Sequence, residues 1–214
     1  GIFANLISSA SKISNVSVKG SINAPSTDVI GGFARIITGT DTEVKNCTSD
    51  VSITGHKQVG GFAHSVQSGA LVDNCIAKGN INALHHAGGF VSSNYNSTIS
   101  NSISYTDITI NPTEYDALDS GGFAAACGDG SKFEKCTSYG SVTNIANVSL
   151  GSNSYTHTLG GFVGATAGSV TLTNCDANSN VKSNQDYVGG FIGCINPDST
   201  VTMTGCNANG TLTT

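Results

Sequence analysis

The sequence predicts an all-β protein, folded as a single-stranded, right-handed parallel β-solenoid (β-helix) of about seven turns. A repeated triplet, a set of apolar columns in register with it, and the composition lead to this prediction. The chain has 27 Gly and only 11% charged residues among its 214. It is rich in Ser, Thr, Asn, Val and Ile, which is typical of a β protein with many turns.

The triplet is Gly-Gly-Phe, and Gly1-Ile-Phe-Ala is a variant copy of it. Copies begin near residues 1, 31, 60, 88, 121, 160 and 189, so the repeats are 28 to 39 residues long and fill residues 1–214 as one domain. A fixed period of this length is the signature of a solenoid, in which each turn buries its apolar columns on the next turn.

The first element of each repeat is the corner made by the triplet. Two glycines let the chain bend tightly or pass close to its neighbour. If side chains alternated strictly between the two faces of the strand, the Phe after the glycines would lie on the outer face. A bulge at the glycines would turn it inward. We expect it to point inward, because a row of exposed Phe would be a large apolar patch. The predicted core ladder contains Phe33, Phe62, Phe90, Phe123, Phe162 and Phe191.

The next elements are short strands around a second column, 13 to 15 residues after each Phe. This column is Val16, Cys47, Cys75, Ile103, Cys136, Cys175 and Cys206. Further columns lie three residues before it and two and six residues after it. In the fourth repeat they are Ser100, Tyr105 and Thr109. Asn commonly precedes the Cys column, and Asn favours turn conformations. The crossover rule predicts right-handed coiling, and seven turns at about 4.8 Å make a rod about 34 Å long.

The cysteine column has two interpretations. Neighbours such as Cys47 and Cys75 would have Cα atoms about 4.8 Å apart, within disulfide range, although their parallel Cβ vectors make the geometry awkward. We expect buried free thiols that act as small apolar residues, because Val16 and Ile103 share the column. The seven cysteines are an odd number, so at least one is unpaired within the chain. No Cys-x-x-Cys spacing occurs, and we expect no metal site.

The histidines are also not expected to form a metal site. His85 and His157 both stand three residues before the first glycine of a triplet. They are two turns apart, about 10 Å, which is too far to share a metal. We expect them to be surface or corner residues.

A second corner, between the last column of one repeat and the next triplet, accepts insertions. The segments 111–120 and 144–159 leave adjacent turns there and should lie side by side. Tyrosines and carboxylates suit sugar or peptide recognition, and binding residues are often on such loops. The candidate ligand residues are Glu114, Tyr115, Asp116, Asp119, Tyr155 and His157. The alternative is a variable loop without a ligand.

These columns resemble the GLUG motif of bacterial cell-surface proteins, which include adhesin-like proteins and the repeat regions of some IgA-specific proteases. The best copies are GGFVGATAGSVTLTNCDANSNV from residue 160 and GGFIGCINPDSTVTMTGCNANGTL from residue 189. Copies with Ala34, Ala63 and Ala124 lack the last Gly of the motif. The resemblance implies a surface-exposed β-solenoid that serves as a stalk, spacer or adhesive module. It implies no catalytic residues.

Composition narrows the partners. The net charge is −5 with no basic run, so nucleic acid is not expected. No stretch approaches the roughly 18 apolar residues of a membrane span, so this segment should not insert in a membrane. No capping segment is evident at either end. This predicts either a piece of a longer array or subunits that stack end to end.

The expected function is therefore a non-catalytic, extracellular or cell-surface structural or adhesive role in a bacterium, with no cofactor. The first hypothesis is a stalk or fibre subunit whose partners are copies of itself or adjoining repeats. The second is an adhesin module that binds a glycan or host surface protein at the 111–120/144–159 corner. A carbohydrate-active β-helix enzyme is the weakest, because no paired carboxylates recur on a strand face.

Overall fold

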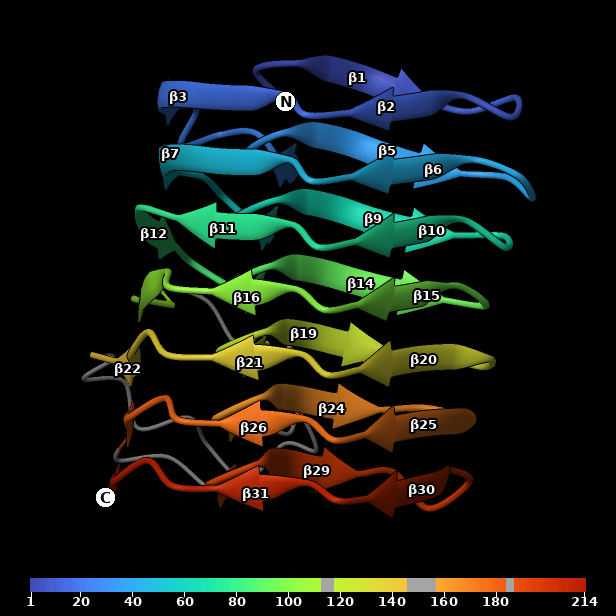
Figure 1. Cartoon of the computed structure of the whole chain (residues 1–214). Helices are drawn as coiled ribbons and strands as arrows, with labels where there is room; N and C mark the ends of the chain where they lie inside the picture. Colours follow the sequence, from blue (N-terminus) through green and yellow to red (C-terminus); the bar gives the residue numbers. More distant parts are fainter. Residues whose placement is uncertain (113–117, 146–156, 184–186) are drawn as a thin grey trace.

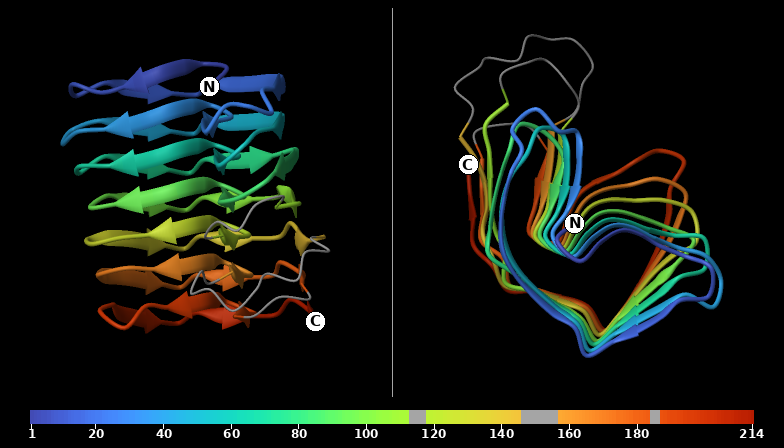
Figure 2. Two further views of the ribbon diagram at one scale, coloured as in Figure 1. Left: turned by 180° about the vertical axis from the view of Figure 1, so that it is seen from behind. Right: turned by 90° about the horizontal axis from the view of Figure 1, so that it is seen from above.

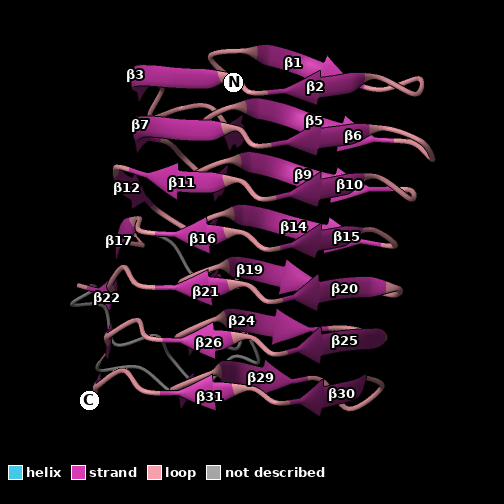
Figure 3. Ribbon diagram, viewed as in Figure 1, coloured by secondary structure: helices cyan, strands magenta, loops and turns pink. Residues whose placement is uncertain are grey.

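The computed structural model describes residues 1–112, 118–145, 157–183 and 187–214. These residues form a parallel β-solenoid that contains strands and loops and no helix (Figures 1 and 3). Seen from above the N-terminal end in Figure 2, the chain runs clockwise as it moves away from the viewer. The coil is therefore right-handed, as predicted.

Two sheets follow each triplet, and both contain seven strands. Sheet A contains β1 (Ala4–Ile7), β5 (Ala34–Thr38), β9 (Ala63–Gln67), β14 (Val91–Tyr95), β19 (Ala124–Cys127), β24 (Val163–Thr166) and β29 (Ile192–Ile195). Sheet B contains β2 (Lys12–Ser14), β6 (Glu43–Lys45), β10 (Leu71–Asp73), β15 (Thr98–Ser100), β20 (Ser131–Glu134), β25 (Ser169–Thr173) and β30 (Thr200–Thr204). Neighbours in both sheets pair in parallel, one turn of the coil apart.

Two further sheets complete each turn. Sheet C contains β3 (Ser17–Asn23), β7 (Thr48–Thr54), β11 (Ile76–Lys78), β12 (Asn80–Ala83), β16 (Ile103–Ser104), β17 (Asp107–Ile110), β21 (Thr137–Ser138), β22 (Val142–Asn144), β26 (Asp176–Ala177), β27 (Val181–Lys182), β31 (Asn207–Ala208) and β32 (Leu212–Thr213). Sheet D contains β4 (Val29–Gly31), β8 (Gln58–Gly60), β13 (Ala87–Gly88), β18 (Leu118–Gly121), β23 (His157–Gly160) and β28 (Val188–Gly189). Sheet D has six strands and sheets A and B have seven, so the chain completes between six and seven turns.

The Phe residues of the triplets point into the core. Phe33, Phe62 and Phe90 are fully buried. Their rings stack 4.7 and 4.8 Å apart, within 7° of parallel. Phe133 adds an edge-on contact 5.8 Å from both Phe123 and Phe162. The prediction of an inward aromatic ladder is confirmed.

The two glycines of the triplet are required by close backbone contacts. A Cβ on the first glycine, Gly60, would lie 1.8 Å from the carbonyl oxygen of Ala63. A Cβ on the second, Gly61, would lie 2.2 Å from the carbonyl oxygen of Gly89 in the next turn. The hydroxyl of Ser49 donates a hydrogen bond of 2.8 Å to the carbonyl oxygen of Gly61. The corner is thus closed by its own neighbours and leaves no room for a ligand.

The second column contains the predicted cysteines, but the residue predicted for its fourth position, Ile103, is wrong. Ile103 pairs with Ile76, so Ser102 occupies the position beside Cys75. The neighbouring columns shift with it, and Ile99 and Ile108 replace Ser100 and Thr109. Ser104, and not Tyr105, occupies the column two residues after it. The fourth repeat is one residue shorter before this column, and the true register buries the better apolar set.

The residue before this column adopts a left-handed conformation in every turn, with φ between 49° and 66°. These residues are Asn15, Asn46, Asn74, Asn101, Lys135, Asn174 and Gly205. Asn and Gly tolerate this region best, which explains the Asn preference. In one pair of turns the amide of Asn74 donates to the side-chain oxygen of Asn46 at 2.8 Å.

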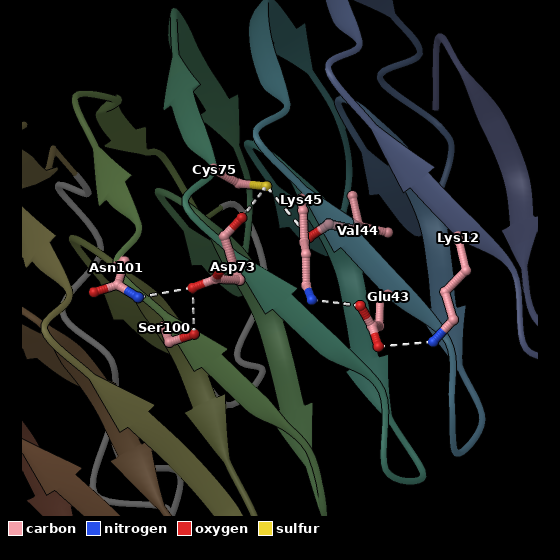
Figure 4. Close-up of polar contacts among 8 residues, drawn as sticks. All are labelled: Lys12, Glu43, Val44, Lys45, Asp73, Cys75, Ser100 and Asn101. Carbon is pink, nitrogen blue, oxygen red and sulfur yellow. Dashed lines mark hydrogen bonds and ion pairs between the residues drawn. The ribbon is translucent and has the colours of Figure 1, made fainter.

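The exposed face of sheet B carries polar ladders (Figure 4). Glu43 accepts hydrogen bonds from Lys12 at 2.7 Å and Lys45 at 2.5 Å, which lower the pKa of Glu43 to about 2. Asp73 accepts hydrogen bonds from Ser100 and Asn101 in the next turn. Such exposed pairs contribute little to stability, so the stacked core is the main source of stability.

Candidate binding groove

The cross-section of the solenoid is bent, and sheets A and D form the two walls of the bend (Figure 2). We call this concave surface the elbow groove. One wall is the column two residues before each triplet, which is Val29, Gln58, His86, Asp119, Thr158 and Tyr187. The other is the column two residues after each Phe, which is Asn5, Arg35, His64, Ser92, Ala125, Gly164 and Gly193.

The elbow groove narrows from the N-terminal to the C-terminal end of the rod. Side chains on its sheet A wall decrease from Arg35 and His64 to glycine at Gly164 and Gly193. A Cβ on Gly164 would lie 2.5 Å from the backbone nitrogen of Ser120 in sheet D. In Figure 2 one lobe swings toward the other from the N-terminal to the C-terminal turns. His64 reaches across the groove to the backbone of Gln58 in sheet D, whereas Gly164 allows the two sheets to approach closely.

The open part of the elbow groove contains a pocket of about 390 Å³. It crosses four successive turns, from Ile36 in the second to Asp119 and Ala126 in the fifth. The other lining residues are Gln58, His64, Ser65, Gln67, His86, Ser92, Ser93 and Tyr95. No Lys or Arg lines it, and Asp119 is its one carboxylate.

The two histidines of the pocket carry ring nitrogens that can form hydrogen bonds with a ligand. Burial, with the nearby Arg35 charge, lowers the pKa of His64 to about 4. Its ring also hydrogen bonds to the backbone of Gln58, while its buried Nδ1 has no partner among the described residues. Nδ1 of His86 accepts a 3.1 Å hydrogen bond from the backbone N–H of Asp119, so in the neutral ring the proton is on Nε2.

Asp119 and Tyr95 are also held in place. One carboxylate oxygen of Asp119 accepts a 2.7 Å hydrogen bond from Thr158, and the other lies 3.6 Å from Nδ1 of His86. The ring of Tyr95 occupies the place where a Cβ on Gly128 would be, with ring carbons at 2.0 Å. Burial raises the pKa of Tyr95, so its hydroxyl stays protonated and can donate. The pocket thus presents hydrogen-bonding groups beside an aromatic ring, and its carboxylate is already engaged by Thr158.

The predicted ligand corner is only partly described. Glu114, Tyr115, Asp116 and Tyr155 lie outside the described residues. Asp119 lines the elbow groove, and His157 is 4% exposed at the start of β23. Whether the two insertions form a binding site therefore stays a prediction.

His85 and His157 do occupy one column, two turns apart, with Leu118 between them. His85 is fully buried and His157 nearly so, so of the two expected placements, surface or corner, the corner is correct and the surface is wrong. Both rings are buried in the column at this corner and are not exposed to solvent. Within the described ranges, no group of His, Cys, Asp and Glu could hold a metal ion.

All seven cysteines are free thiols, and Cys47, Cys75, Cys136 and Cys175 are buried as predicted. Cys47 and Cys75 are neighbours in this column, and the backbone N–H of Cys47 donates a 3.4 Å hydrogen bond to Sγ of Cys75. The interaction between the two thiols lowers the pKa of Cys47 and raises that of Cys75, because one thiol can stabilise its ionised neighbour but two adjacent thiolates repel. The column is a packing element, and Cys75 also donates to the carbonyl oxygen of Val44 (Figure 4).

Comparisons with known proteins agree with the fold. No family model and no curated protein matches the chain. Among solved structures, a chain titled "IgA1 Protease" matches with a TM-score of 0.63 and 18% sequence identity. The match covers 84% of this chain and 16% of that one. The protein is thus a β-solenoid that resembles part of an IgA1 protease.

The elbow groove was not found by sequence reasoning. Its residues share no motif, and they meet because two sheets face each other across a bend. The one available signal was the decrease in side-chain size two residues after each Phe, from Arg35 to Gly193.

No described segment forms a helix long and apolar enough to cross a membrane.

Proposed function

We propose that the chain is a non-catalytic structural module of a bacterial cell-surface or extracellular protein, a GLUG-type stalk or fibre segment. The observation that carries the proposal is the unbroken Phe stack, which runs from Phe3 to Phe191 through every turn. A single aromatic column with four sheets around it is a stiff spacer, because each turn contacts only the turns above and below it.

The end turns support end-to-end stacking. Phe3 is 42% exposed and Met203 is 41% exposed. Their neighbours in the same columns, Phe33 and Leu172, are fully buried. Ile2 and Leu212 are also exposed there. These apolar end faces match the interior faces of the rod, so they suit another turn of the same kind, from adjoining repeats or a second copy.

Sedimentation velocity of the purified chain over a concentration series tests this proposal. We expect species that grow with concentration. Phe3→Lys or Met203→Lys should abolish the growth, because a charge would be buried in the joint. Tyr105→Lys is the matched control, since Tyr105 is 45% exposed on the flank of the rod. A monomer at every concentration, or equal growth in the end-face variants, would contradict end-to-end stacking.

A further inference from the structure

The elbow groove has the features of a ligand site that the structural role does not use. Its pocket of about 390 Å³ is large enough for a small ligand. Polar groups converge on it from both walls, and all of them except His86, which directly precedes β13, lie on paired strands. His64 presents a buried Nδ1 without a partner in the described part of the chain.

The charges of the pocket select a neutral ligand. Its lining has no Lys or Arg that would recognise a phosphate, sulfate or carboxylate. Its one carboxylate, Asp119, is engaged by Thr158 and faces His86. The nearby cation Arg35 donates to Asn5 at 2.8 Å, toward the first turn. The pocket lining therefore offers an anion no cation, and its one carboxylate is already engaged by Thr158.

The remaining groups suit a ligand with many hydroxyls. Gln58 and Gln67 carry amides that both donate and accept, and Ser65, Ser92 and Ser93 carry hydroxyls. Tyr95 adds an aromatic ring with a polar tip, and Ile36 and Ala126 add apolar surface. A sugar ring has the matching surface, with hydroxyls at its rim and C–H groups on its faces.

We propose that the elbow groove binds a neutral oligosaccharide, which lies along the rod axis across the second to fifth turns. Tyr95 packs on a sugar ring, and the amides, hydroxyls and imidazoles of the two walls contact its hydroxyls. The closed end at Gly164 sets the limit of the site toward the C-terminal turns. This binding does not depend on end-to-end stacking, so each can fail alone.

The experiment is a titration of the chain with a panel of oligosaccharides, followed by calorimetry and by chemical shifts of Tyr95 and His64. The panel contains neutral glucose, galactose, mannose and N-acetylglucosamine oligomers, with sialylated and sulfated oligomers and an unrelated neutral peptide as comparisons. We expect at least one neutral oligomer to bind, and Tyr95→Ala to weaken it about tenfold or more. Tyr105→Ala is the matched control and should leave binding unchanged, because Tyr105 is equally exposed outside the pocket.

Two further variants test the geometry without removing the tyrosine. Gly128→Ala displaces the Tyr95 ring, since Gly128 is not in a left-handed conformation and the ring fills the place of the new Cβ. Ser93→Arg places a long side chain at a residue that lines the pocket. Both should weaken binding as Tyr95→Ala does, while circular dichroism reports an unchanged fold. The proposal is overturned if no neutral oligomer binds, if only the acidic oligomers or the peptide bind, or if Tyr95→Ala and Ser93→Arg both bind normally.

Discussion

At the residue scale, the glycines of the triplet have a steric role. Each second glycine faces the carbonyl oxygen of the second glycine in the next turn. The contact is so close that any Cβ would push two turns apart. In the last turn the same position is open, because the nearest atom to a Cβ on Gly190 is the Cβ of Ala208 at 3.8 Å. Gly190 is therefore a control for substitutions at the second glycine of the other triplets.

Gly61→Ala should lower the free energy of unfolding by about 3 kcal/mol or more, since a backbone atom and not a flexible side chain must move. Gly190→Ala should change it by less than about 0.5 kcal/mol. Urea denaturation of both variants measures the difference. Equal effects at the two positions would show that close stacking is not the reason for the glycine.

His64 should make stability depend on pH. Its pKa in the folded protein is about 4, below the unfolded value of about 6.5. The unfolded state therefore binds more protons between these values, so stability falls as the pH is lowered from 6.5 to 4, by up to about 3 kcal/mol. Denaturation of wild type and His64→Gln across this range checks the effect. The variant should lose this slope, and an identical slope in both proteins would contradict it.

At the element scale, the Phe stack joins the strands of successive turns into one core. An interior ring of the stack lies between two stacked neighbours, whereas Phe3 stacks only on Phe33, at 4.8 Å. Stacked aromatic pairs add to the free energy gained by burial. Loss of an interior ring leaves a cavity that the rigid sheets cannot close.

Phe90→Ala should cost about 3–5 kcal/mol of unfolding free energy, as large-to-small core substitutions do. Phe3→Ala should cost about 1 kcal/mol or less, because Phe3 is partly exposed and borders a single neighbour. Thermal and urea unfolding measure both. Similar losses for the two variants would mean that the stack does not act as a shared core.

The sequence predicted the elements well because seven copies report the same columns. Register was wrong in the fourth repeat, where Ile103 was assigned the position of Ser102, because an apolar match outweighed spacing in the absence of neighbouring strands. The inward orientation of the Phe side chains was predicted correctly, because an outward row would have exposed a large apolar patch. The elbow groove depends on the angle between sheets A and D, which no single strand encodes.

At the scale of the whole molecule, one column of changing side-chain size alters the shape of the rod. Arg35 and His64 at the N-terminal end and Gly164 and Gly193 at the C-terminal end turn a uniform coil into a tapered elbow groove. The rod can thus be a regular spacer inside and carry a distinct surface outside. The proposed structural role and the proposed binding role would therefore use different surfaces of the rod.

The most direct test of the structural account is electron microscopy of the concentrated chain, with measured particle lengths. We expect straight rods whose lengths are multiples of about 34 Å, because sheet A contributes seven strands per chain at a spacing of about 4.8 Å, with the strand spacing continuous across each joint. Particles of one unit length only, or joints that connect flank to flank, would contradict the claim that the chain is a stacking structural module.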